Sequence, residues 1–439
     1  MDGDSGPLRN FLFLQSLATP FFPRLAQALS ARGHGARRIN FNGGDRLFWP
    51  LPGAVDFRGA DEDWPAFLAA RLAEWEITDI VLFGDCRPLH LAAREIARAS
   101  GVAVHVVEEG YLRPNWITFE RDGVNGHSTL PRDPKWFRMV AHGAPAWAEA
   151  AAIPSVFARR ASQDVLYSFA CAALAWRFPG YRQHRPWNPF VEYAGWAMKL
   201  ARRPAARRRS AQTMDAVIRS GRPYFLFPLQ LDSDSQLRRH SPFGGIERAL
   251  ERVIASFAAR APADALLVVR EHPLDNGLRD WRARTLDLAA VTGVQDRVRF
   301  VETGDLAQSL AGARGLVTVN STVGVIALSF GLPVIALGSA IYDMPDLTFQ
   351  GGLDNFWTEG TPPDEATFDA FRRVIAQRTQ LNGGFFSDEG IRLAVEGAVR
   401  RLEARSPWAP APATASGRPE PAQPVLSYPK PLTEPRPTR

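Results

Sequence analysis

Residues 316–337 read LVTVNSTVGVIALSFGLPVIAL, the longest apolar stretch of this 439-residue chain. Its length approaches that of a membrane span, but three consecutive polar residues, two glycines and a proline interrupt it. We therefore expect a strand over 315–319, a helix over 322–330 and a strand over 333–337, folded into a buried α/β core. A membrane-spanning helix is the less favoured alternative.

The same alternation of strands and helices extends towards the amino terminus. Further strands are expected at residues 11–15, 36–41, 79–83, 103–108, 224–230, 265–270 and 298–301, and helices at 22–32, 63–76, 88–99, 246–260, 280–292 and 305–311. Helices between successive strands indicate parallel sheets covered on both faces. The sequence therefore predicts two Rossmann-like α/β lobes, residues 8–135 and 221–404, with a ligand cleft where the carboxyl ends of their strands meet.

Residues 136–220, between the lobes, show no strand pattern, and their segment 196–209 contains six basic residues and no acidic one. We expect a helical insertion whose aromatic residues pack inward, or lie on an anionic membrane surface beside basic residues; both can hold. The proposed membrane-facing residues are Trp196, Lys199, Arg202, Arg203, Arg207, Arg208 and Arg209. The six basic residues among them carry a charge equal to the net charge of +6, so the rest of the chain is neutral overall. A local basic cluster on a neutral chain favours a specific anionic partner over nucleic acid.

Composition excludes several classes of protein. The two cysteines, Cys86 and Cys171, are far apart and form no CxxC or Cys/His motif, so neither a disulfide framework nor a structural zinc site is expected. Residues 1–7 lack a cationic region and the apolar stretch 11–17 is too short for a secretory signal, which predicts a cytoplasmic protein. The proline-rich residues 405–439 are expected to form an extended, disordered tail.

Two adjacent carboxylates, Glu108 and Glu109, end one predicted strand of the first lobe. Neighbouring side chains of a strand point to opposite faces, so one carboxylate can face the cleft. Gly110 permits a sharp turn, and Arg113 can pair with a carboxylate or with an anionic substrate. The alternative is an Arg–Glu pair that only holds the loop in place.

Polar motifs also end two predicted strands of the second lobe. Arg270 and His272 suit a phosphate, because Arg offers a fork of donors and His can donate a hydrogen bond or a proton; a structural His is the alternative. The strand 224–230 ends at Gln230 and is followed by Asp234 and Gln236. This segment either faces the same cleft or forms only a turn.

A third motif of the second lobe, Asn320-Ser321-Thr322-Val323-Gly324, lies between a buried strand and a helix. The free N–H groups at the start of the helix can bind phosphate or carboxylate, and plain helix capping is the alternative. Four polar motifs thus end four strands across two lobes, and their meeting at one crevice favours a binding site.

Taken together and in this order, the motifs resemble those of the bacterial capsule polysaccharide biosynthesis and export proteins of the KpsS and LipB type, which are related to the Kdo transferase KpsC. The resemblance covers about residues 10–350 and rests on segments 83–90, 108–114, 228–236, 270–273 and 320–324. It implies a GT-B glycosyltransferase that transfers Kdo from CMP-Kdo to lysophosphatidylglycerol or another anionic lipid. It also implies a peripheral position on the cytoplasmic face of the inner membrane, with the capsule synthesis and export machinery as a further partner.

The resemblance also implies roles for individual residues. Glu109 would be the nucleophile of a retaining double displacement, and His272 would act on the departing CMP phosphate. The related transferase has Glu-Asp-Gly where this chain has Glu108-Glu109-Gly110, so the nucleophile here is longer by one methylene. The implied donor site comprises Arg270, His272, Gln230, Asn320, Ser321, Thr322 and Gly324, and the acceptor side or cleft comprises Asp85, Arg87, Glu108, Arg113, Asp234 and Gln236.

No metal and no other cofactor is expected for this reaction. CMP leaves as a monophosphate whose charge protein donors can meet, and Asp232-Ser233-Asp234, the one Asp-x-Asp considered, lies within the matched glutamine motif. Two other classes remain open: a UDP-sugar transferase or nucleotide-sugar epimerase on the same framework, and a non-catalytic export adaptor that holds the polysaccharide or the transporter.

Overall fold

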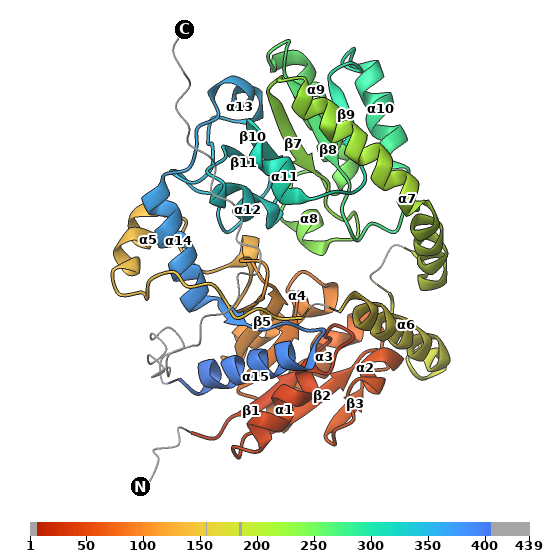
Figure 1. The fold of residues 1–439 in the computed structure, drawn as a ribbon. Coiled ribbons are helices and arrows are strands. Elements are labelled where there is room, and N and C mark those ends of the chain that lie inside the picture. Colours follow the sequence, from red (N-terminus) through yellow and green to blue (C-terminus); the bar gives the residue numbers. More distant parts are fainter. Residues whose placement is uncertain (1–6, 155, 184–186, 405–439) are drawn as a thin grey trace.

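The computed structural model describes residues 7–154, 156–183 and 187–404, and shows two α/β lobes. In Figure 1 the first lobe, red to orange, lies below the second, green to teal. The proline-rich tail and most of the amino-terminal segment considered above lie outside these residues. Within the described ranges, no helix is long and apolar enough to cross a membrane.

The first lobe contains a seven-stranded sheet in the order β12-β6-β5-β4-β1-β2-β3. Its strands are β1 (Asn10–Phe13), β2 (Gly35–Asn40), β3 (Ala54–Asp56), β4 (Asp79–Phe83), β5 (Ala103–Glu109), β6 (Trp116–Arg121) and β12 (Gln380–Asn382), and the helices that join the first five are α1 (Phe21–Ser30), α2 (Gly43–Leu47), α3 (Trp64–Glu74) and α4 (Pro88–Ala99). The five strands β1 to β5 are parallel, as expected. At one edge β6 runs antiparallel to β5, and β12 pairs antiparallel with β6.

The second lobe contains a five-stranded, fully parallel sheet in the order β11-β10-β7-β8-β9. Its strands are β7 (Tyr224–Pro228), β8 (Leu266–Arg270), β9 (Val298–Val301), β10 (Gly315–Thr318) and β11 (Val334–Ala336), and its helices are α8 (Ser235–Arg239), α9 (Ile246–Arg260), α10 (Trp281–Val291), α11 (Leu306–Ala311), α12 (Val323–Ser329) and α13 (Leu353–Glu359). The long apolar stretch forms β10, α12 and β11. Its strand residues are mostly apolar because strands covered on both faces bury nearly all of their side chains. The predicted α/β class with two Rossmann-like lobes is confirmed.

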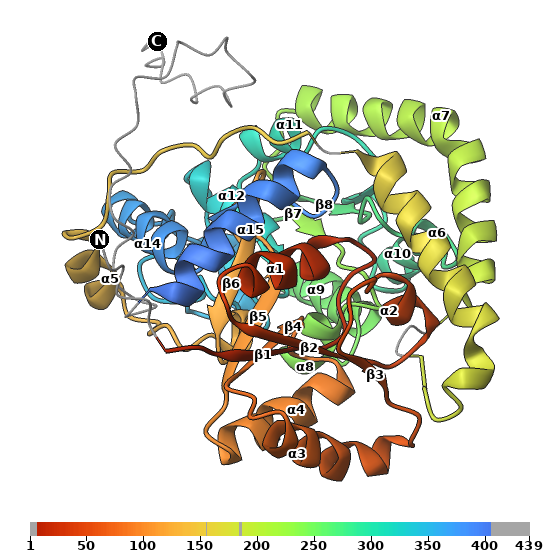
Figure 2. The same cartoon turned by 90° about the horizontal axis from the view of Figure 1, so that it is seen from below.

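The carboxyl-terminal part of the chain returns to the first lobe, which corrects the predicted second-lobe boundary at residue 404. Helix α14 (Glu365–Arg378) packs on α5 (Pro134–Ala141), β12 pairs with β6, and α15 (Asp388–Glu403) packs on α1. Figure 2 shows α15 beside α1. The physical reason is that β6 would otherwise be an open edge with unpaired backbone groups, and β12 covers it.

The insertion between the lobes is helical, as predicted. It contains α6 (Phe157–Ala173), a short 3₁₀ turn (Ala175–Arg177) and α7 (Pro189–Arg219). Helix α6 packs on α2 of the first lobe and α7 packs on β9 of the second, so the insertion joins the two lobes along one side (Figure 1). The contact of α6 needs Gly43, because a Cβ there would lie 2.0 Å from the carbonyl oxygen of Ala170.

Candidate functional site

Glu109 ends β5 with its carboxylate held between two guanidinium groups. Its Oε1 lies 3.2 Å from Nη1 of Arg160 on α6, and its Oε2 lies 3.8 Å from Nη2 of Arg113. The Glu109 side chain is 32% exposed, so a ligand can reach it. Gly110 permits the turn that follows, because a Cβ there would lie 2.3 Å from the carbonyl oxygen of Trp116. The structure therefore presents an accessible carboxylate with compensating positive charge.

His272 of the second lobe lies within electrostatic range of the same two arginines. Burial lowers its pKa to about 4, and the charges of Arg113, Lys199 and Arg160 act in the same direction. Nδ1 of His272 accepts a hydrogen bond of 3.1 Å from the amide of Leu274, which leaves Nε2 to carry the proton. At neutral pH the imidazole is therefore uncharged and can donate a hydrogen bond from Nε2.

Glu108 and Asp234 form a second group of acidic residues, one from each lobe. Burial raises the pKa of Glu108 to about 8, and the charges of Asp234 and Glu109 add to this effect. Asp234 caps α8 by accepting a 2.9 Å hydrogen bond from the amide of Gln236, and burial raises its pKa as well. Glu108 is thus protonated at neutral pH, next to a second carboxyl group that also holds a proton more tightly than usual.

The raised pKa of Glu108 predicts a pH-dependent stability difference. Below about pH 4.5 the carboxyl is neutral in both the folded and the unfolded chain, and as pH rises towards 8 only the unfolded chain ionises, so this group's contribution to stability is lost. The slope reaches at most about 1.4 kcal/mol per pH unit. The wild-type protein should therefore lose stability relative to Glu108→Gln as the pH rises from 5.5 to 7.5. Urea unfolding of both proteins measures this difference in unfolding free energy, and a difference that does not change with pH contradicts the assignment.

The residues predicted to bind the sugar donor hydrogen-bond to one another and hold the loops of the second lobe together. Nε2 of Gln230 donates to Oδ1 of Asn320 at 2.8 Å, and the Asn320 amide donates back to Oε1 of Gln230 at 3.0 Å. The Ser321 hydroxyl accepts from the amide of Val323 at 3.2 Å. Thr322 is the N-cap residue of α12, and Gly324 makes room for the hydroxyl of Tyr342. These residues shape the cleft, and their contacts with a donor stay a prediction.

Some predicted ligand-binding or membrane-facing residues have partners within the protein. Arg270 is buried, with Nη1 3.3 Å from the Ser309 hydroxyl and Nη2 bonded to the carbonyl of Gly304. Lys199 binds Glu271 at 2.5 Å, and Arg209 binds Glu302 at 2.9 Å. Both ion pairs link α7 to the second lobe, but Arg209 stays 45% exposed. The membrane-facing role of the two residues stays a prediction.

Asp85 joins the two lobes. Its carboxylate accepts hydrogen bonds from the amide of Val124 at 3.1 Å and from Nε2 of Gln236, in the second lobe, at 3.3 Å, and it contacts Nδ1 of His127 at 2.9 Å. Burial alone would raise the pKa of Asp85, but the His127 contact and the charge of Arg94 lower it. The fully buried carboxylate acts here as an interlobe contact.

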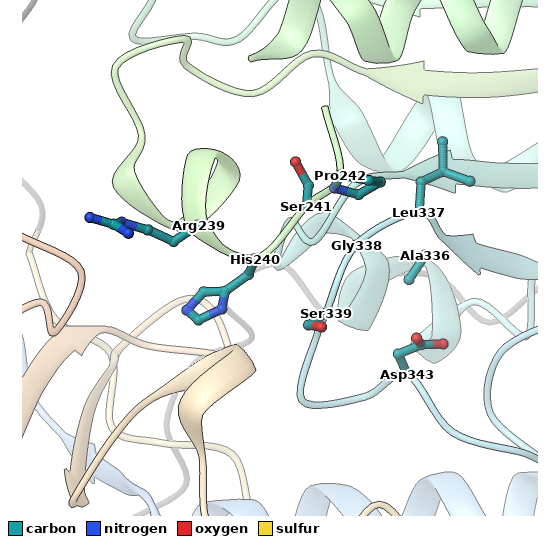
Figure 3. Close-up of a pocket in the computed structure, with 9 residues that line it drawn as sticks. All are labelled: Arg239, His240, Ser241, Pro242, Ala336, Leu337, Gly338, Ser339 and Asp343. Carbon is teal, nitrogen blue, oxygen red and sulfur yellow. The ribbon is translucent and has the colours of Figure 1, made fainter. Parts of the chain in front are cut away.

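Two cavities open near these residues. The larger, about 620 Å³, lies between α6, α7 and loops of both lobes, and its lining includes Arg87, Arg160, Phe157, Tyr193 and Trp196. Trp196 thus lines a cavity, whereas the sequence analysis placed it on a membrane surface. The smaller, about 450 Å³, lies in the second lobe, and Figure 3 shows His240 pointing from it towards the first lobe.

The insertion also presents an exposed apolar surface. The large apolar side chains exposed on α6 and on the first half of α7 are Phe157, Leu166, Phe169, Phe190, Val191, Met198 and Leu200. The remaining predicted basic residues, Arg202, Arg203, Arg207 and Arg208, are exposed farther along α7. We name these two sets together the insertion surface.

Sequence reasoning missed Arg160 and the contacts of Asp85 with His127. Arg160 lies in the insertion, where the periodicity gives no indication of which side chain reaches Glu109. His127 follows β6, a strand that the sequence analysis did not predict. A basic residue in the predicted helical insertion was the available signal for Arg160, but the sequence analysis gave it no role and considered only the later basic cluster, residues 199–209.

Comparison with known proteins agrees with the motif resemblance. Residues 78–386 match the family described as "Capsule polysaccharide biosynthesis protein". The chain is 32% identical over 379 residues to the capsule polysaccharide export protein KpsS of Escherichia coli, covering 86% of this chain and 97% of that protein. It is 34% identical over 385 residues to the capsule polysaccharide modification protein LipB of Neisseria meningitidis serogroup B, covering 86% and 92%.

Solved structures show only a distant likeness. Thermosulfurimonas dismutans KpsC, described as a β-Kdo 2,7 transferase, aligns over 89% of this chain and 98% of its own with a TM-score of 0.44 and 13% identity. At this level of similarity, the neighbour carries no argument about substrate or residue roles.

Proposed function

Because this chain belongs to the capsule polysaccharide biosynthesis protein family, we propose that it is a retaining glycosyltransferase that moves Kdo from CMP-Kdo to lysophosphatidylglycerol. The observation that supports the proposal most is the grouping at the cleft: an accessible Glu109 beside Arg113 and Arg160, with the neutral His272 within electrostatic range of the same arginines. The choice of Kdo rests on the motif resemblance.

In the first step Glu109 attacks the anomeric carbon of Kdo. A bond forms between the Glu109 carboxylate oxygen and that carbon while the bond to the phosphate oxygen breaks, and its electron pair leaves with CMP. Arg113 and Arg160 offset the charges of the Kdo carboxylate and the phosphate, and Nε2 of His272 donates a hydrogen bond to the departing oxygen. The leaving group is a monophosphate, so the reaction as written needs no metal and no other cofactor.

In the second step a glycerol hydroxyl of the acceptor attacks the same carbon and releases Glu109. Attack from opposite faces in two successive displacements retains the anomeric configuration. The hydroxyl proton passes to the ionised member of the Glu108 and Asp234 pair, whose raised pKa values favour proton acceptance near neutral pH.

The larger cavity supplies a place for the acyl chain of the acceptor. Arg160 lines this cavity and also binds Glu109, so the cavity lies next to the side chain that contacts the reacting carboxylate. Aromatic side chains such as Phe157 and Trp196 provide its apolar lining. The insertion surface then lies against the inner membrane, where its exposed arginines meet anionic headgroups.

Replacing Arg202, Arg203, Arg207 and Arg208 together by Gln should weaken binding to phosphatidylglycerol vesicles. Each cation near an anionic surface contributes about 1 kcal/mol, so the loss is expected to be on the order of 100-fold or more, measured by vesicle co-sedimentation. Zwitterionic phosphatidylcholine vesicles are the control, and both proteins should bind them equally weakly. Unchanged binding to anionic vesicles contradicts the membrane assignment.

The proposal is tested with purified protein, CMP-Kdo and a fluorescent lysophosphatidylglycerol. We expect one Kdo-bearing lipid product in the β configuration, identified by mass spectrometry and NMR. Turnover with UDP-sugars in place of CMP-Kdo would indicate a UDP-sugar transferase or an epimerase. Absence of both transfer and CMP-Kdo hydrolysis, with each candidate acceptor, would indicate an export adaptor.

A further inference from the structure

Four metal-ligating side chains that the transferase mechanism does not use meet between the lobes. We propose that they bind one zinc-like divalent transition-metal ion, which fastens the two lobes together; the ligands are Asp85, Cys86, His127 and His240. One ligand atom from each residue lies within 4.8 Å of the other three. The proposal stands on this geometry and does not depend on the transferase reaction.

The distances suit a tetrahedral ion. Sγ of Cys86 lies 3.2 Å from Nε2 of His240 and 3.3 Å from Oδ1 of Asp85, and Nδ1 of His127 lies 2.9 Å from Oδ2 of Asp85. Zinc bonds of about 2.0–2.3 Å place tetrahedral ligands roughly 3.3–3.8 Å apart. These three contacts lie within a few tenths of an ångström of that spacing, and all four ligand atoms lie within 4.8 Å of one another, so an ion would spread the shortest contacts and draw in the longest.

The chemistry of the ligand set points to the same class of metal. A thiolate, two imidazoles and a carboxylate are typical zinc ligands. The two anionic ligands balance the charge of a divalent ion, as a buried site requires: Asp85, Cys86 and His240 are 0%, 3% and 8% exposed. Four protein ligands leave no open position for a substrate, so the site is structural.

The fold orients these ligands from outside. The amide of Val124 and Nε2 of Gln236 hold the Asp85 carboxylate, as outer hydrogen bonds do around metal sites. His240 lies against Gly126, where a Cβ would come within 2.3 Å of its Nδ1. His240 also lines the smaller cavity (Figure 3), so one ligand of the site borders a space open to an ion.

Arg94 is the cation that competes for this site. Its Nη1 lies 3.0 Å from Nδ1 of His127 and 3.6 Å from Oδ2 of Asp85. Its Nε donates separately to the carbonyl of Asp122 at 3.0 Å. When a metal binds, Arg94 loses its contact with His127 but retains its hydrogen bond to the carbonyl of Asp122. Its side chain therefore stays beside the occupied site.

Three ligands come from the first lobe and one from the second. Asp85 and Cys86 lie in the loop between β4 and α4, His127 ends the 3₁₀ turn Asn125–His127, and His240 is the C-cap of α8. A metal held by all four ties the lobes together next to the cleft. It therefore stabilises the packing of one lobe on the other without touching the substrates.

The test is cobalt binding by the purified full-length protein after chelator treatment. We expect about one Co²⁺ per chain, with a thiolate-to-metal charge-transfer band and the intense visible bands of tetrahedral Co²⁺, and competition by Zn²⁺. Cys86→Ser should abolish the thiolate band and weaken affinity at least about 100-fold. Cys171→Ser, which changes the other cysteine, should bind like the wild type.

A second measurement covers the case in which Cys86→Ser does not fold. Zn²⁺ should raise the melting temperature of the wild-type protein, because a ligand that binds only the folded state stabilises it. Gly126→Ala, which displaces His240 and leaves every ligand intact, should show a smaller rise. Absence of a thiolate band together with no Zn²⁺-dependent rise overturns the proposal and leaves the four side chains as a hydrogen-bond network.

Discussion

Replacing Glu109 by Gln is expected to abolish Kdo transfer while CMP still binds. The amide has nearly the same shape as the carboxylate but cannot form the covalent intermediate, so the rate should fall on the order of 10³-fold or more. CMP should bind with little change in affinity, because Arg113, Arg160 and His272 keep their positions around the phosphate. Initial rates with CMP-Kdo and a fluorescent lysophospholipid measure the first quantity, and calorimetric titration with CMP measures the second.

Glu109→Asp is the matched control for this variant. It keeps the carboxylate and shortens it by one methylene, which reproduces the Glu-Asp-Gly pattern of the related transferase. Measurable transfer by Glu109→Asp, with none by Glu109→Gln, is the pattern that a nucleophilic carboxylate predicts. Normal turnover by the Gln variant would falsify the assignment.

Replacing His272 by Ala is expected to lower kcat by about 10²- to 10³-fold. The lost group is the hydrogen-bond donor to the departing phosphate oxygen, a contact that strengthens as charge develops there. His272→Gln retains an N–H donor and should recover part of the rate. Steady-state kinetics should place the loss in kcat more than in KM.

A structural role for His272 predicts a different result. His272 accepts a hydrogen bond from the Leu274 amide, so a merely structural His would lower the melting temperature of both variants and change kcat little. Equal kcat for the His272→Ala and His272→Gln proteins, each well below the wild type, would also contradict a donor role. Circular dichroism melts run beside the kinetics separate these outcomes.

Much of the fold was predictable because it depends on local pattern. Strand β4 and helices α4 and α9 begin and end where the sequence predicted, since apolar runs and clear boundary residues mark them. The return of the chain to the first lobe was not predictable in the same way. Strand β12 has three residues, and its pairing with β6 joins segments that are far apart in sequence.

The candidate site was predictable to the extent that it follows strand ends. Glu109 and His272 lie at the carboxyl ends of β5 and β8, and the two-lobed topology brings them near the same arginines. The partners of long side chains were not predictable, because sequence position does not determine which way a flexible cation turns. Arg270 and Lys199 turn towards protein partners, whereas Arg160 reaches Glu109.

The cluster of Asp85, Cys86, His127 and His240 shows a second reason why parts of the structure could not be predicted from the sequence. Asp85 and Cys86 are adjacent, but His127 and His240 come from later segments with no metal-binding spacing. Only the packing of one lobe on the other brings these side chains together. A search for short motifs therefore cannot find such a site.

The proposed mechanism requires a covalent bond between Glu109 and the transferred sugar. Its most direct test is to mix purified protein with CMP-Kdo, quench in acid without acceptor, and measure intact and peptide masses. We predict an added mass of one Kdo residue, located on the peptide that contains Glu109 and absent from Glu109→Gln. An adduct on a different residue, or a transfer product with inverted anomeric configuration, would contradict the account.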